Sequence, residues 1–168
     1  GTAALGAMLP LAATRAGAQT VERRLVAEAS RVNITGAQYP DTAVWAYGRT
    51  IPGPEIRVRQ GERLRVEIEN RLPQATTIHW HGVRVPNAMD GVPHLTQAPI
   101  EPGARFAYEF DAVDTGTFWY HPHERSFEQV ARGLCGALIV EERKPIAVDR
   151  DLTWVLGDWR LQPDAQLR

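Results

Sequence analysis

Four of the five histidines in this chain form two His-x-His pairs, His79-Trp80-His81 and His121-Pro122-His123. On a β-strand, residues i and i+2 point to the same face and lie about 6.5–7 Å apart. Each pair would therefore present two imidazoles side by side, and two facing strands would bring four ring nitrogens into a small space. Neutral imidazole binds copper, zinc, iron and nickel. The pattern favours a multinuclear metal site over acid–base catalysis, which usually needs one well-placed histidine.

The residues around these pairs predict short β-strands that would hold them. Apolar and polar residues alternate with period two over 57–59, 63–69, 105–110 and 117–120, and residues 134–140 form an apolar run typical of a buried strand. Another strand is predicted to begin at Leu152, whereas no segment after Ala29 shows a long 3.6-residue period. Pro122 cannot donate a ladder hydrogen bond, so the second pair should lie at a strand end or an edge. We expect an all-β protein, an antiparallel Greek-key β-sandwich with the histidines at one rim.

Composition limits the classes of function that remain. The 168 residues fit one domain with its flanks, and 43% hydrophobic residues are enough for a packed core. A formal net charge of -1 and the absence of a Lys/Arg-rich run argue against nucleic-acid binding. The single cysteine, Cys135, excludes an internal disulfide framework and a cysteine-rich zinc site.

The N-terminal residues indicate export. Residues 2–13 are mostly Ala, Leu, Gly and Met, a run too short to span a membrane but similar to the apolar core of a secretory signal. Ala16-Gly17-Ala18 then fits a small-x-small cleavage site. We interpret residues 1–18 as the remnant of an export signal, which predicts a periplasmic or secreted protein. A disordered Ala/Gly tail is the alternative.

Three motifs resemble the first cupredoxin domain of the multicopper oxidases, a family that includes laccases, bacterial cuprous oxidases and copper-resistance oxidases. They are His79-Trp80-His81-Gly82, Asn87-Ala88-Met89-Asp90-Gly91-Val92-Pro93 and Gly116-Thr117-Phe118-Trp119-Tyr120-His121-Pro122-His123, with support from residues 51–54 and 133–142. The resemblance covers roughly Ala27 to the end of the chain. It implies a cupredoxin-like domain over residues 27–157, preceded by an N-terminal arm at 19–26 and followed at 158–168 by the start of a linker to a further domain.

The resemblance also implies an activity and a cofactor. Multicopper oxidases reduce dioxygen to water while taking single electrons from a substrate such as a phenol, an amine or cuprous ion. Their trinuclear cluster contains one type 2 and two type 3 coppers. By position, His79 is similar to a type 2 ligand, and His81, His121 and His123 are similar to type 3 ligands. The other half of the cluster and the type 1 copper would come from a C-terminal cupredoxin domain, in the same chain or in a neighbouring subunit, so this segment alone should be inactive.

The remaining candidate residues have alternatives. Family resemblance gives Asp90 a role in proton delivery to the oxygen being reduced, although Asp90-Gly91 is also a common turn pair. His94 belongs to neither pair, and we expect a solvated side chain there. Cys135 lacks the nearby histidines of a type 1 copper site and is predicted to fill a small space in the core. The aromatic residues Trp80, Trp119 and Tyr120 could relay electrons, but packing is the favoured interpretation.

Two other functions remain compatible with the sequence. One is a non-enzymatic copper-binding or copper-tolerance domain, and the other is a metal-free structural relative of the cupredoxins. The second is weakened because all four histidine positions are intact.

Overall fold

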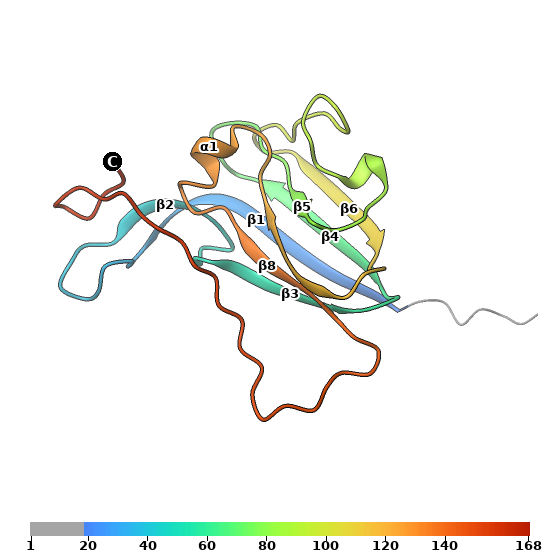
Figure 1. Cartoon of the computed structure of the whole chain (residues 1–168). Coiled ribbons are helices and arrows are strands. Elements are labelled where there is room, and N and C mark those ends of the chain that lie inside the picture. Colours follow the sequence, from blue (N-terminus) through green and yellow to red (C-terminus); the bar gives the residue numbers. More distant parts are fainter. Residues whose placement is uncertain (1–18) are drawn as a thin grey trace, which may run out of the picture.

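Two four-stranded sheets pack face to face in the computed structural model, which describes residues 19–168 (Figure 1). The first sheet has the strand order β2 (Thr42–Tyr47), β1 (Thr20–Val32), β4 (Arg63–Asn70), β6 (Arg105–Asp111). The second has the order β3 (Gly53–Arg59), β8 (Gly136–Glu141), β7 (Gly116–His121), β5 (His79–His81). Short helices occur at Asn87–Met89 (3-10) and at Ser126–Gln129 (α1).

The predicted all-β Greek-key sandwich is confirmed, but the sheets are not antiparallel throughout. β1 runs parallel to β4, and β3 runs parallel to β8, while the remaining neighbours are antiparallel. Both parallel pairs join strands that are separated in the sequence by at least one strand of the other sheet.

Residues 20–26, within the expected N-terminal arm at residues 19–26, form the first half of β1. Residues 20–27 pair in register with residues 63–70 of β4. Leu25 is buried in the core, while Arg24 on the solvent face donates a hydrogen bond to Glu69 of β4. Charged residues on the outward face make this strand difficult to recognise from the sequence. It is identified by its pairing with β4.

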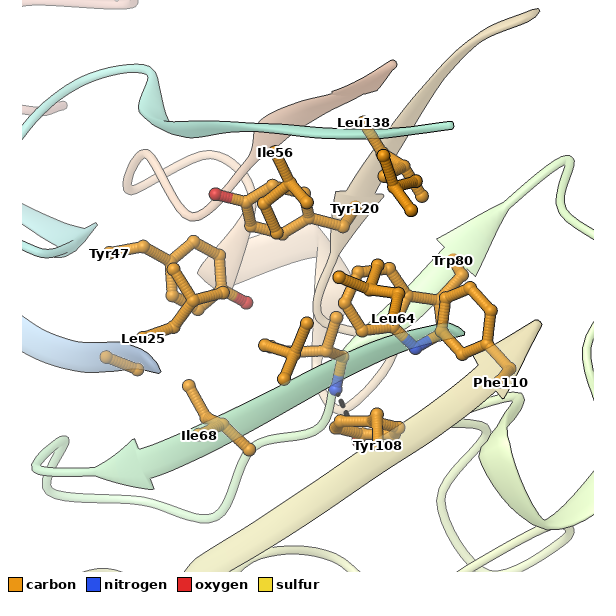
Figure 2. Packing of buried hydrophobic residues seen from close by; sticks show 14 of the residues in the cluster. Leu25, Tyr47, Ile56, Leu64, Ile68, Trp80, Tyr108, Phe110, Tyr120 and Leu138 are labelled. Atoms are coloured by element: carbon orange, nitrogen blue, oxygen red, sulfur yellow. Dashed lines mark hydrogen bonds between the residues drawn. The ribbon is translucent and has the colours of Figure 1, made fainter. Parts of the chain in front are cut away.

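Aromatic and branched aliphatic side chains fill the space between the sheets. The centre of this core is Trp80, whose ring packs at centroid distances of 5.1 Å from Phe110, 5.6 Å from Tyr108 and 5.9 Å from Tyr120 (Figure 2). Leu64 and Leu138 contribute from opposite sheets and are fully buried. Burial of one such aliphatic side chain contributes about 1.5–3 kcal/mol to the free energy of unfolding.

The strand predicted from Leu152 onward does not form. The chain after β8 makes a wide excursion past β3 and carries several exposed apolar side chains (Figure 1). It is attached through side chains rather than a backbone ladder, because Arg57 of β3 donates to Asp151 Oδ2 at 2.8 Å and to Thr153 Oγ1 at 3.3 Å. Residues 158–168 then return to β2, where Thr42 Oγ1 donates to the Ala165 carbonyl at 2.7 Å.

Two predictions about the chain ends remain open. The export signal at residues 1–18 lies outside the described residues, and the role of residues 158–168 as a linker stays a prediction. Within residues 19–168, no helix is long and apolar enough to cross a membrane.

Candidate metal centre

The two histidine-bearing strands lie side by side at one edge of the second sheet. β5 pairs antiparallel with β7, which places His79 opposite His121 and Trp80 opposite Tyr120. Trp80 and Tyr120 point inward and are fully buried, so the alternation of side chains turns the histidines to the outer face. The aromatic residues thus hold the strands against the core, which agrees with the packing role predicted for them.

The four paired histidines converge at this edge. The ring centroid of His79 lies 5.7 Å from that of His81, 5.4 Å from that of His121 and 5.2 Å from that of His123. A ligand nitrogen from each of His79, His81 and His121 lies within 4.8 Å of the others. β7 ends at His121, immediately before Pro122, as the proline predicted. The expected convergence of the two pairs at one rim is therefore present.

Hydrogen bonds with backbone carbonyls determine which ring nitrogen is available. His79 Nδ1 lies 2.8 Å from the Asp90 carbonyl oxygen, and His121 Nδ1 lies 2.9 Å from the Pro122 carbonyl oxygen. A carbonyl can only accept, so in each ring Nδ1 carries the proton and Nε2 keeps a free lone pair. Metal-ligating histidines are oriented in this way by their outer partners.

His121 is the most deeply placed ligand candidate. Burial, together with the neighbouring imidazoles, lowers the pKa of His121 to about 4, so its ring is neutral at pH 7. Its Nε2 lies 3.3 Å from His81 Nδ1, a separation that lets both nitrogens bond to one metal ion. Trp119 stacks on the His121 ring with a centroid distance of 4.0 Å and an interplanar angle of 25°. Imidazole nitrogens are donors that fit copper.

Asp90 reaches the cluster from the loop that follows β5. Its carbonyl holds His79, and its carboxylate Oδ1 lies 3.4 Å from His79 Nδ1. Gly91 makes this approach possible: its φ is +76°, and a Cβ added there would lie 1.8 Å from the Ile78 carbonyl oxygen. Asp90 thus ends the short 3-10 helix and also contacts a predicted ligand, and its role in proton delivery stays a prediction.

The other two candidates lie apart from the cluster. His94 has a side chain that is 77% exposed, with its Nε2 4.0 Å from a Glu124 carboxylate oxygen. Cys135 is half-buried, and burial raises the pKa of its thiol. Among residues 19–168, the histidine group that could hold a metal includes neither of them.

The stacking of Trp119 on His121 agrees with the packing predicted for this residue. The buried contacts of Thr77 and Gln129 with the histidine segments were not evident from the sequence. Their positions in the sequence could have indicated these contacts. Thr77 lies two residues before His79 and Gln129 lies six residues after His123, and both stretches contribute residues to the core.

Histidines that could hold a metal ion, gathered at the edge of a two-sheet sandwich, are typical of a metal-binding β-sandwich domain. The model of the multicopper oxidase family matches residues 28–145, and this chain belongs to that family.

Similar proteins agree in fold and in family. The chain is 38% identical over 153 residues to copper resistance protein A of Escherichia coli, covering 90% of this chain and 24% of that protein. It is 37% identical over 142 residues to multicopper oxidase MmcO of Mycobacterium tuberculosis, covering 84% of this chain and 27% of that protein. The crystal structure of a multi-copper oxidase from Pseudomonas thermotolerans matches with a TM-score of 0.86 and 43% identity, covering 90% of this chain and 37% of that one. The cupredoxin-like fold is thereby confirmed, and the chain spans about a quarter of the length of these curated relatives.

Proposed function

We propose that this chain is the N-terminal cupredoxin domain of a multicopper oxidase. It would supply half of the trinuclear copper cluster that reduces dioxygen to water during one-electron oxidation of a substrate. The observation that carries this proposal is the convergence of four imidazoles on one sheet edge, three of them with nitrogens within 4.8 Å, in a member of this family. In this assignment His79 binds the type 2 copper, and His81, His121 and His123 bind the type 3 coppers.

The residues of the chain hold and orient the ligands. Copper, when bound by imidazoles, cycles between Cu(I) and Cu(II) and supplies the electron transfer to oxygen. The carbonyls of Asp90 and Pro122 keep His79 and His121 in the tautomer that presents Nε2. Stacking against Trp119 limits rotation of the His121 ring.

Asp90 is the proposed proton relay. Reduction of dioxygen to water consumes protons, which must reach the buried side of the cluster. The Asp90 side chain is one-third exposed, so it can exchange protons with solvent, while its carboxylate oxygen is 3.4 Å from a predicted ligand ring. These two properties support the proposal that Asp90 carries protons between solvent and the cluster.

A second cupredoxin domain, in the same chain or in a neighbouring subunit, would complete the centre. His81 and His123 are exposed, so the cluster is open on its outer side. Trp119 also lines an adjoining groove of about 1070 Å³, whose apolar walls include Phe127, Trp154 and Leu156. The curated relatives are about four times longer than the matched segment, which leaves room for such a domain. That domain would carry the type 1 copper and the site for the electron donor, a phenol, an amine or cuprous ion.

A non-enzymatic role in copper tolerance is the second candidate. The similarity to a protein named for copper resistance is compatible with it. The two functions differ in turnover, because a binding domain takes up copper without consuming oxygen.

The same proposal places the protein in the periplasm or outside the cell. Support comes from the apolar N-terminal run and the small-x-small sequence Ala16-Gly17-Ala18.

Replacing His81 tests the proposed function in the full-length, copper-loaded protein. His81→Ala should lose type 3 copper and reduce oxygen consumption with a phenol or diamine donor about 100-fold or more, because no distant group replaces a direct ligand. His94→Ala is the control, since that histidine is exposed and outside the cluster. Metal analysis and an oxygen electrode provide the measurements.

The outcomes separate the candidates. Unchanged copper content and turnover in His81→Ala would make the proposed centre wrong. Stoichiometric copper uptake by the wild-type protein without oxygen consumption would favour the binding domain instead.

A further inference from the structure

A fully buried amide joins α1 to the segment that leads into β5. Gln129 is 0% exposed, and its side-chain Oε1 accepts a hydrogen bond from Thr76 Oγ1 at 2.7 Å. Its Nε2 donates to the Ala75 carbonyl at 2.8 Å. Both ends of the amide are therefore bonded to Ala75 and Thr76, the two residues that precede Thr77. His79 follows two residues after Thr77.

A second buried side chain links this segment to the other histidine pair. Thr77 is 0% exposed, and its Oγ1 accepts a hydrogen bond from the backbone N–H of His123 at 3.1 Å. The ladder of β7 ends at His121, so the His123 amide has left the sheet and needs another acceptor. Thr77 supplies it from the chain segment that carries His79.

The segment before His79 is held from both sides. On the core side, the Ile78 N–H donates to the Tyr108 hydroxyl at 2.8 Å. On the other side, the residues that follow Gln129 are fixed to β2, because the Arg132 guanidinium lies 4.6 Å from the Trp45 ring and the Trp45 N–H donates to the Arg132 carbonyl at 2.9 Å. Gln129 is therefore followed by residues that are fixed to β2.

We propose that Thr77 and Gln129 are positioning residues that set the spacing between the His79 pair and His123, and so control how firmly the cluster holds copper. This inference rests on the proposed function. An apolar side chain would fill the same buried space without the cost of desolvating a polar group. The buried polar side chains of Thr77 and Gln129 therefore indicate a role beyond packing. The hydrogen bonds of Thr77 and Gln129 connect the segment before His79 to the segment that contains and follows His123. Loss of such an outer contact typically costs 10–100-fold in metal affinity, that is, about 10-fold or more here.

The test uses the full-length, copper-loaded protein and isosteric changes. Thr77→Val removes the acceptor for His123, Thr77→Ser restores a hydroxyl, and Gln129→Met removes both amide hydrogen bonds at similar volume. Thr42→Val is the matched control, because Thr42 is also 0% exposed and its hydroxyl also bonds to backbone, at the Ala165 carbonyl, away from the histidines. The measurements are the rate of copper loss to a chelator, the electron paramagnetic resonance spectrum of the type 2 copper, and the melting temperature.

We expect Thr77→Val and Gln129→Met to lose copper about 10-fold faster and to show an altered copper spectrum. Thr77→Ser should return to wild-type values, and Thr42→Val should lower only the melting temperature. If Thr77→Val lowers the melting temperature as Thr42→Val does while copper release and spectrum stay unchanged, the inference is overturned and the proposed function stands. If the wild-type protein takes up no copper, the proposed function fails as well. Should Gln129→Met not fold, the Thr77→Val and Thr77→Ser pair decides the question.

Discussion

At the residue scale, one hydrogen bond determines what each central histidine can bind. The carbonyls of Asp90 and Pro122 accept hydrogen bonds from Nδ1–H of His79 and His121, and both rings then present Nε2 to the cluster. His121 stays neutral at pH 7 because burial lowers its pKa to about 4. His121 therefore needs neither deprotonation nor ring rotation before a metal binds.

The Asp90 side chain can be altered without moving His79. The 2.8 Å contact of His79 is with the backbone carbonyl, which Asp90→Asn retains. We expect Asp90→Asn to keep its copper while oxygen reduction slows about 100-fold, within the range for loss of a general acid. Copper content and turnover should be measured on the same preparation beside His81→Ala. Equal copper loss in the two variants would make Asp90 structural, and unchanged turnover would remove it from the mechanism.

At the element scale, a loop and a strand must come very close together to build the site. The loop after β5 folds back so that Gly91 lies against the Ile78 carbonyl, with no room for a Cβ. β5 itself has only three residues, His79–His81, and relies on β7, the core side of Trp80 and this loop for its position. The short strand is therefore defined by its neighbours rather than by its own ladder.

Gly91→Ala should separate the loop from β5. The added Cβ would meet the Ile78 carbonyl at 1.8 Å, so the backbone must shift, and the free energy of unfolding should fall by about 3 kcal/mol or more, together with loss of copper. Gly103→Ala is the matched control, because its φ is +81° but nothing lies within 4 Å of an added Cβ. The free energy of unfolding of Gly103→Ala should fall only by the roughly 1–2 kcal/mol that an alanine in the left-handed conformation costs. Denaturant unfolding of both variants gives the comparison, and similar losses would argue against close packing at Gly91.

At the scale of the whole molecule, charged residues tie the strands of the first sheet together on its outer face. Glu69 of β4 bonds to Arg71 and Arg24, and Arg105 of β6 donates to it at 3.0 Å. These hydrogen bonds and charges lower the pKa of Glu69 to about 2. The contact with Arg24 also holds the first half of β1, which sequence analysis had assigned to an arm.

Glu69→Gln should destabilise the protein in a pH-dependent manner. A folded pKa near 2 lies below the unfolded value of about 4.3, so the ionised form of Glu69 stabilises the fold above pH about 4.3. This contribution is lost as the pH falls towards 2. The melting temperature of Glu69→Gln should therefore be lower than wild type at pH 7, and the gap should close between about pH 4.5 and 2. Glu22→Gln, on an exposed side chain of β1, should show no such trend, and a constant gap for Glu69→Gln would contradict the assignment.

Residues 19–168 produced alone should bind copper without oxidising phenols or diamines. They carry half of the proposed cluster, and the thiol of Cys135 has a pKa raised by burial and lies outside the histidine group. Absorption spectra of the copper-loaded segment provide the measurement. An intense band near about 600 nm, typical of copper–thiolate sites, would show that Cys135 is a ligand after all.

The sequence by itself determined the features that depend on local chemistry. Side-chain alternation places His79 with His81 on one face, Pro122 ends β7, and the motifs around both pairs indicate the family. Only the tertiary structure decided which segments meet: His79 with His121, residues 20–26 with β4, and Gln129 with the segment before β5. It also left residues 152–156 without a partner strand. The physical reason is that periodicity and turn chemistry act over a few residues, whereas strand pairing and the burial of a polar side chain are set by parts of the chain that are distant in sequence.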